Sequence, residues 1–172
     1  GKTAAFALPI LQRLVDNPAP VQPSNARVLI LTPTRELAAQ VASNINDFAK
    51  YLGISTLTIV GGGKQDVQAK KLKAGAHIIV ATPGRLLEHL TACNLSLSGV
   101  ETLVLDEADR ILDMGFSADV QQILQAVNKT RQNLLFSATF SEAVKKLANL
   151  MLDKPQVAAV DKMTAHSVMR KG

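Results

Sequence analysis

The chain has 172 residues, 47% of them hydrophobic, and a formal net charge of +5. This length suits one domain with a sizeable core, and the apolar runs are too short for a membrane-spanning helix, which needs about 20 apolar residues. The positive charge is compatible with a polyanionic partner. Only 3% of the residues are aromatic, so few side chains could stack on bases. If the partner is a nucleic acid, we expect the protein to hold it by its sugar-phosphate backbone.

Short β-rich runs alternate with helical stretches along the whole chain. Strands are predicted near 27–32, 55–60, 77–81, 101–105, 133–137 and 156–160. A helix is predicted over 36–52, where an apolar stripe at spacings of three and four is formed by Leu37, Val41, Ile45, Phe48 and Leu52. Similar stripes predict helices over 117–127 and 141–152. The alternation predicts an open α/β fold, a parallel sheet with helices on both faces.

Two segments are predicted to lack regular structure. Residues 16–26 ("DNPAPVQPSNA") contain three prolines and are typical of an exposed loop between the first helix and the first strand. Residues 161–172 show no periodicity, which predicts a linker or a frayed end.

Polar and glycine-rich clusters follow the predicted strands. They are "TPTRE", "GGGK", "TPGR", "DEAD" and "SAT". Open α/β sheets bind ligands beyond the carboxyl ends of their strands, so these clusters predict a functional site along one edge of the sheet.

The segment "LVLDEAD" ends a predicted strand with two adjacent carboxylates. Asp106 is suited to holding Mg²⁺, which takes few protein carboxylates and keeps its waters, and Glu107 to polarising an attacking water. The alternative is an acidic helix N-terminus, where the helix dipole favours both residues.

The chain opens on "GKT", which matches the last three letters of the phosphate-binding loop G-x-x-x-x-G-K-[ST]. In that interpretation Gly1 lets backbone amides close on phosphate, Lys2 reaches the phosphates, and the Thr3 hydroxyl joins the Mg²⁺ shell. A plain helix start is the alternative.

Thr-Pro pairs precede two predicted helices. Thr82 is a suitable N-cap with Pro83 as the first helical residue, and capping explains the Thr and Pro letters in both places. It does not explain Arg35 and Arg85, because a cation in the first turn opposes the helix dipole. Together with free backbone amides, each arginine favours a phosphate clamp.

The remaining clusters allow two interpretations each. Glycine in "VGGGKQ" permits close approach to a nucleic-acid strand, or forms a plain turn. Ser137 and Thr139 could hydrogen-bond the acidic cluster, or simply complete a strand end. His77 and His89 are interpreted as surface or packing residues, because the histidines and Cys93 show no metal-ligand spacing. A single cysteine fits a reducing compartment, and we expect a cytoplasmic protein without membrane contact.

Six motifs occur in a fixed order over positions 1–160: "GKT", "PTRELA", "GG", "TPGR", "DEADRILDMGF" and "SAT", with Gln68 between the glycines and "TPGR". In this the chain resembles the DEAD-box RNA helicase family, specifically its first RecA-like domain, and is similar to the bacterial RhlE group. The resemblance implies a P-loop NTPase fold with three α/β/α layers, with ATP and Mg²⁺ as cofactors and RNA as partner.

The resemblance also implies roles for individual residues. Gly1, Lys2, Thr3, Asp106 and Glu107 would bind ATP and Mg²⁺, with Thr3 and Asp106 at the metal and Glu107 activating water. Asp109 would hydrogen-bond Ser137 and Thr139 and couple the nucleotide site to the RNA site. The RNA backbone would be gripped by Pro33, Thr34, Arg35, Gly61, Gly62, Thr82, Gly84 and Arg85.

The family's upstream glutamine element, the strand feeding "GKT" and the second RecA-like domain with its arginine fingers have no counterpart in the sequence. We therefore expect a fragment of a monomeric RNA-dependent ATPase, nearly silent alone because arginine fingers contribute on the order of 10³ to 10⁵ in rate. Two alternatives remain open: a DNA-translocating helicase, and a catalytically silent RNA- or protein-binding fragment.

Overall fold

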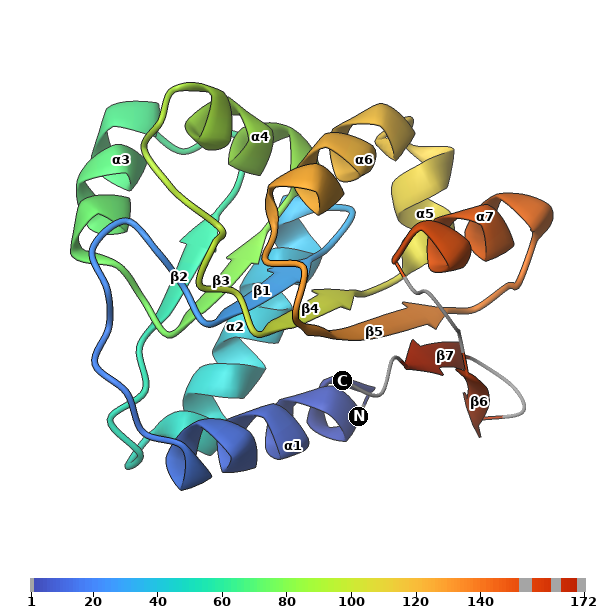
Figure 1. Cartoon of the computed structure of the whole chain (residues 1–172), viewed down its shortest axis with the longest axis horizontal. Coiled ribbons are helices and arrows are strands. Elements are labelled where there is room, and N and C mark those ends of the chain that lie inside the picture. Colours follow the sequence, from blue (N-terminus) through green and yellow to red (C-terminus); the bar gives the residue numbers. More distant parts are fainter. Residues whose placement is uncertain (1, 152–155, 162–164, 170–172) are drawn as a thin grey trace.

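The computed structural model describes residues 2–151, 156–161 and 165–169. A seven-stranded sheet in the order β2-β3-β1-β4-β5-β7-β6 forms its centre, and helices cover both faces (Figure 1). The strands are β1 (Val28–Leu31), β2 (Thr56–Ile59), β3 (Ile78–Ala81), β4 (Thr102–Leu105), β5 (Gln132–Ser137), β6 (Gln156–Asp161) and β7 (Ala165–Met169). The predicted open α/β fold is confirmed.

Seven helices occur in the described part of the chain: α1 (Lys2–Asp16), α2 (Arg35–Ala49), α3 (Gln65–Ala74), α4 (Pro83–Thr91), α5 (Ala108–Asp113), α6 (Ser117–Ala126) and α7 (Glu142–Met151). Helices α1 and α2 cover one face of the sheet, and α3 to α7 cover the other (Figure 1). The proline-rich segment joins α1 to β1 as a largely exposed loop, as predicted. Within these described residues, no helix combines the length and the apolar character that crossing a membrane requires.

The first five strands are parallel, and their paired residues are in register across the sheet. Leu31, the last residue of β1, pairs with Ala81 of β3 and with Leu105 of β4. Ala81 in turn pairs with Ile59 of β2, and Leu105 with Leu135 of β5. The loops that follow β1 to β4 therefore leave the sheet side by side at the same height.

Alternation along each strand divides the core in two. Leu29 and Leu31 of β1 pack in the cluster with α3 to α7, whereas Val28 and Ile30 pack against α1 and α2. Successive side chains of a strand point to opposite faces, so a strand covered on both faces is apolar throughout. In each of the strands β1, β3 and β4, all four residues are buried.

The apolar stripe predicted for the helix after β1 was only partly right. Val41 and Ile45 are buried, but Phe48 and Leu52 are 41% and 43% exposed. The buried face of α2 is completed by alanines, Ala38, Ala42 and Ala49. Helix α2 packs on both the sheet and α1, and small residues allow this close approach, while the larger Phe48 lies at the margin.

The C-terminal segment differs from its prediction. Strand β6 occurs where 156–160 was predicted, but its partner is β7, in antiparallel orientation. Strand β7 itself lies within 161–172, predicted as a linker or frayed end, and pairs antiparallel with β5. Without it the outer backbone groups of the buried β5 would lack ladder partners, which is costly. Residues 162–164 and 170–172 lie outside the described residues.

Candidate functional site

Asp106 and Glu107 follow β4 directly, in the middle of the sheet's carboxyl edge. The backbone amide of Asp106 donates to the carbonyl of Leu31 at 2.9 Å, which extends the ladder by one residue, and Asp106 is 3% exposed. The strand therefore positions a buried carboxylate at the point where a ligand can approach.

Glu107 turns the chain sharply from β4 into α5. Its φ is +52°, in the left-handed region, a conformation that costs an L-residue roughly 1–2 kcal/mol. Glu107 is the N-cap residue of α5 but makes no side-chain capping hydrogen bond. Its carboxylate lies 3.7 Å from Nη1 of Arg110 and stays partly exposed. A capping role therefore does not account for this glutamate.

Asp109 joins α5 to the end of β5. Its backbone amide donates to Ser137 Oγ at 3.2 Å, and its Oδ2 accepts from the hydroxyl of Thr139 at 3.0 Å. Its other oxygen, Oδ1, accepts from the amide of Arg110 at 3.0 Å. The predicted contacts of Asp109 with Ser137 and Thr139 are both present, the first through the backbone and the second through the side chain.

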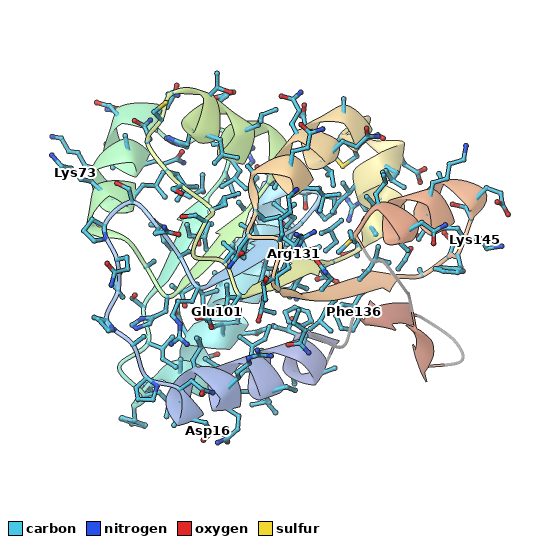
Figure 2. The ribbon with its side chains drawn as sticks, in the orientation of Figure 1. Asp16, Lys73, Glu101, Arg131, Phe136 and Lys145 are labelled. Carbon is cyan, nitrogen blue, oxygen red and sulfur yellow. The ribbon has the colours of Figure 1, made fainter. Side chains whose placement is uncertain are left out.

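The start of α1 lies near the same end of β5. The ring of Phe6 packs on Phe136, with centroids 5.3 Å apart, and Figure 2 shows Phe136 on the last part of β5. The Thr3 hydroxyl accepts a long hydrogen bond from Asn44 of α2, at 3.4 Å. Gly1 lies outside the described residues, and its phosphate role, like those of Lys2 and Thr3, stays a prediction.

The two Thr-Pro corners differ in detail. Thr82 is the N-cap of α4 and Pro83 its first residue, as predicted. The N-cap of α2 is Thr34, whose hydroxyl accepts from the amide of Leu37 at 3.2 Å. Pro33 precedes this cap, so the idea of one shared design holds only for α4. Both helices nevertheless carry an arginine in the first turn.

Arg35 and Arg85 flank the glycine loop after β2. Gly62 has a φ of +84°, and a Cβ there would lie 2.6 Å from Nη1 of Arg35. Arg85 donates from Nη1 to the carbonyl of Gly63 at 2.7 Å. Because β2, β3 and β1 are neighbours, the residues predicted to contact RNA from three loops come together. Gly84 faces α6 at ordinary contact distance, so packing alone does not require glycine there.

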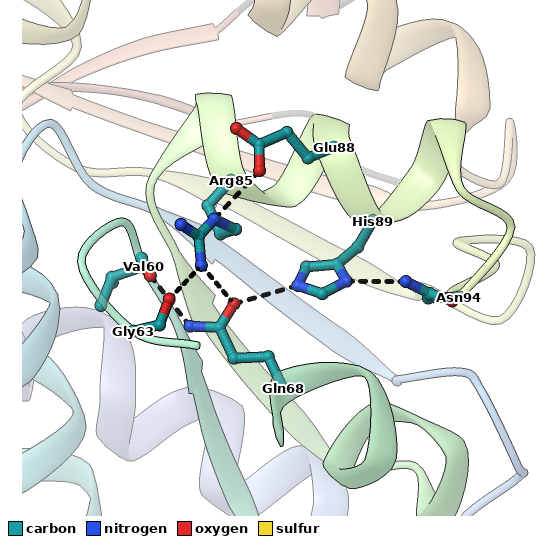
Figure 3. Close-up of polar contacts among 7 residues, drawn as sticks. All are labelled: Val60, Gly63, Gln68, Arg85, Glu88, His89 and Asn94. Carbon is teal, nitrogen blue, oxygen red and sulfur yellow. Dashed lines mark hydrogen bonds and ion pairs between the residues drawn. The ribbon is translucent and has the colours of Figure 1, made fainter. Parts of the chain in front are cut away.

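Three polar residues behind Arg85 were not recognised as functional from the sequence. Gln68 of α3, His89 of α4 and Asn94 form a hydrogen-bonded chain that reaches Arg85 (Figure 3); Gln68 and His89 are buried, and Asn94 is partly buried. His89 was interpreted as a surface or packing residue; it is fully buried, which excludes the surface role, and it is hydrogen-bonded on both ring nitrogens. Its position four residues after Arg85 places both on one helix face, and this spacing is the signal that could have indicated the network.

His77 has a packing role, consistent with its interpretation. Its Nδ1 accepts from the amide of Ser55 at 3.0 Å, just before β3 begins. This is the amino edge of the sheet, opposite the polar clusters. Burial, and then the charge of Arg27, lower the pKa of His77.

The chain matches a model of the DEAD/DEAH box helicase family over residues 1–147. It is 48% identical to DEAD-box ATP-dependent RNA helicase 28 of Oryza sativa subsp. japonica over 90% of its own length and 19% of that protein. It is 46% identical to ATP-dependent RNA helicase DeaD of Escherichia coli (strain K12), over 91% of the chain and 24% of the relative. The chain therefore spans about a fifth to a quarter of these relatives.

Among solved structures, the chain resembles the yeast DEAD-box splicing factor Prp28, with a TM-score of 0.78 and 37% identity. That match covers 87% of this chain and 36% of the Prp28 chain.

Proposed function

The chain belongs to the DEAD/DEAH box helicase family, and on this premise we propose that it is part of the first RecA-like domain of an ATP-dependent RNA helicase. The relatives reported above carry that activity in their names. The chain covers a minor part of each, so hydrolysis and unwinding are proposed for the whole protein, and the 172 residues are proposed to be nearly inactive alone.

One observation carries the proposal most directly. The Asp106–Glu107 pair after β4 is joined, through Asp109, to the end of β5 by the 3.0 Å bond with Thr139. The loops after β1, β2 and β3 continue the same edge with two arginines and a glycine turn. A carboxylate pair and a cationic surface that share one edge of the sheet are what hydrolysis coupled to polyanion binding requires.

The carboxylates suit a nucleotide carried with Mg²⁺. Asp106 is a hard oxygen ligand at a strand end, and Mg²⁺ binds through one or two carboxylates while it keeps several waters. When bound, the ion would neutralise charge that develops on the phosphates. We propose that Asp106 holds it together with Thr3, and that Gly1 and Lys2 hold the phosphates. Glu107, held close to Asp106 and partly exposed, would orient and polarise the attacking water.

RNA is proposed to bind along the loops after β1, β2 and β3. Arg35 and Arg85 would contact phosphates, and the open glycine turn between them would let the sugar-phosphate backbone approach. The remaining contacts would come from the polar residues predicted at this edge, Pro33, Thr34, Gly61, Gly62, Thr82 and Gly84. Such contacts carry no base information, which predicts binding with little sequence preference.

Other properties stay proposals: Mg²⁺ as the metal, a monomeric state, a cytoplasmic location and similarity to the bacterial RhlE group. A second RecA-like domain that supplies arginine fingers would complete the ATP site. The sequence predicted limits of 1–160 for this unit, but β7 pairs with β5 in the same sheet, so we propose that the unit extends at least to Met169. The alternative function, a silent RNA- or protein-binding fragment, applies to the isolated chain.

The test is ATP hydrolysis by the full-length protein with RNA or with DNA of the same sequence. We expect strong stimulation by RNA and little by DNA. Equal stimulation would favour the DNA-translocating alternative, and absence of hydrolysis with either would contradict the proposal.

A further inference from the structure

We propose that His89 is a positioning residue for the RNA-binding edge: acting through Gln68, its imidazole holds the Arg85 guanidinium and the glycine loop in the arrangement that receives a phosphate. This inference rests on the proposed function, and it assigns a role to a buried side chain that contacts neither nucleotide nor RNA.

Gln68 is the centre of the network (Figure 3). Its Nε2 donates to the carbonyl of Val60 at 2.9 Å, which ties α3 to the end of β2. Its Oε1 lies 3.1 Å from Nη1 of Arg85 and 2.9 Å from Nε2 of His89. The same Nη1 donates to the carbonyl of Gly63 at 2.7 Å. One amide therefore links the glycine loop, the arginine and the histidine.

The hydrogen bonds determine which nitrogen of His89 carries its proton. The bond to Val60 requires the Gln68 nitrogen to face the carbonyl, so the Gln68 oxygen faces Arg85 and His89, and both must donate. Nε2 of His89 is then protonated, and Nδ1 is the acceptor for Nδ2 of Asn94 at 3.1 Å. With the Asn94 amide oriented as in the structure, the network is satisfied by the neutral imidazole with its proton on Nε2.

The contacts that hold Arg85 within the protein leave one nitrogen of its guanidinium for a ligand. The contacts to Gly63 and Gln68 use Nη1, and the ion pair with Glu88 uses Nε, 3.1 Å from Oε2. None of these contacts uses Nη2. A guanidinium fixed in this way loses little further freedom when it meets a phosphate, which is the benefit of preorganisation.

The surroundings of His89 disfavour its protonated form. Burial, and then the positive charge of Arg85, lower the pKa of His89, while Glu88 raises it less. The groups that face it from α3 and from the segment after α4 are the neutral Gln68 and Asn94. Helix α6 packs on α4 and brings Asp119 beside Gly84. A proton on Nδ1 would face the Asn94 amide hydrogens and place a second cation beside Arg85, so acid should disturb the support of Arg85.

Two substitutions separate positioning from packing. His89→Gln can keep an N–H for the Gln68 oxygen but does not titrate, whereas His89→Leu keeps volume and removes both polar contacts. His77→Asn is the matched control, because His77 is the other histidine with a lowered pKa among the described residues. It lies at the opposite edge of the sheet, and asparagine keeps an acceptor for the Ser55 amide.

The first measurement is binding of labelled single-stranded RNA by the 172-residue chain, from about pH 5 to about pH 8. We expect His89→Leu to weaken affinity about three- to tenfold near neutral pH, as removing one partner of a buried polar group does. His89→Gln should bind within about twofold of the wild type and lose less affinity in acid. His77→Asn should reproduce the wild-type pH profile.

The second measurement does not depend on RNA. Imidazole nitrogen NMR should show His89 protonated on Nε2 near neutral pH, and His89→Leu should shift the Gly63 amide and the Arg85 side-chain resonances, which His77→Asn should not. If the wild-type chain fails to bind RNA, the proposal that this edge binds RNA by itself is wrong, and the spectrum still shows whether His89 holds Gln68 and Arg85. The inference is overturned if His89→Leu leaves these resonances and the affinity unchanged, or if His89→Gln keeps the wild-type pH profile.

Discussion

The hydroxyl of Thr139 donates to Oδ2 of Asp109 at 3.0 Å, which joins the loop after β5 to the first turn of α5. Asp109 is two residues from Glu107, and Ser137, the last residue of β5, accepts a hydrogen bond from the Asp109 amide through its hydroxyl oxygen. Any shift of β5 relative to α5 would therefore be transmitted to the residues that follow β4.

Replacing Thr139 by Val keeps the side chain's shape but removes this donor. We expect the full-length protein to retain ATP hydrolysis and lose unwinding, and the domain to lose about 0.5–1 kcal/mol of stability. Hydrolysis and strand displacement measured on the same preparation test this. Ser141→Ala, which removes a cap bond to Val144, is the control, and a parallel loss of both activities would argue against a coupling role.

Glu107→Gln should reduce ATP hydrolysis by about 100-fold or more, because an amide cannot accept the proton of the attacking water. ATP binding should remain. Glu142→Gln changes a highly exposed glutamate of α7 and should have no effect. Single-turnover hydrolysis with the full-length protein measures the change, and a normal rate in Glu107→Gln would remove this residue from the chemistry.

Arg85→Ala should weaken RNA binding and flatten its salt dependence. Losing one phosphate contact on a single strand lowers the slope of log affinity against log salt by about 0.7. Arg13→Ala removes the same charge from the far end of α1, where Arg13 contacts Gln132 at the start of β5, and the slope should stay unchanged. Identical slopes for both variants would place Arg85 outside the phosphate contacts.

Gly62→Ala should destabilise the domain by about 1–2 kcal/mol, because its positive φ disfavours a side chain. The new Cβ would also lie 2.6 Å from Arg35 Nη1 and displace that guanidinium, so RNA affinity should fall as well. Gly61→Ala is a close control for stability, since no atom lies within 4 Å of its added Cβ. Urea unfolding compares the two, and equal midpoints would contradict the strain at Gly62.

Acid should destabilise the folded chain through His77 and His89. Both pKa values are lowered in the folded state, mainly by burial, so the unfolded chain binds protons first. The contribution is complete above the ordinary histidine pKa of about 6.5 and is lost as the pH falls from there toward the folded values. A His77→Asn, His89→Gln double variant should show a shallower loss of stability in urea titrations over this range.

The sequence predicted the parallel strands well because β1, β3 and β4 are buried on both faces and largely apolar, and each of them is followed by polar or turn residues. Asp106, Arg35 and Arg85 were predicted to lie on one edge of the sheet because each follows a strand, and the carboxyl ends of parallel strands lie at the same edge. The exposed Phe48 was not predictable from spacing alone, because the choice between Phe48 and Ala49 depends on how closely α1 and the sheet approach α2. Strand β7 was missed because residues 161–172 show no periodicity and because its pairing with β5 joins segments that are distant in sequence.

The role of His89 also lay beyond the sequence. A histidine on an apolar helix face is consistent with ordinary packing, and Gln68 stands on another helix, 21 residues away. Only the fold shows that the carbonyl of Val60, just after β2, orients the Gln68 amide so that its oxygen accepts from Nε2 of His89.

The level register of the parallel strands has a consequence for how this surface can vary. Leu31, Ala81, Leu105 and Ile59 end at one height, and one inserted residue in any of these strands would raise its loop by about 3.3 Å and turn the following side chains to the other face. Such a shift of one loop would move Arg35 or Arg85 out of reach of a phosphate that both arginines contact. Length changes should therefore be accommodated at the opposite rim, in connections such as the proline-rich loop, while the rim that carries the arginines keeps a constant count of residues.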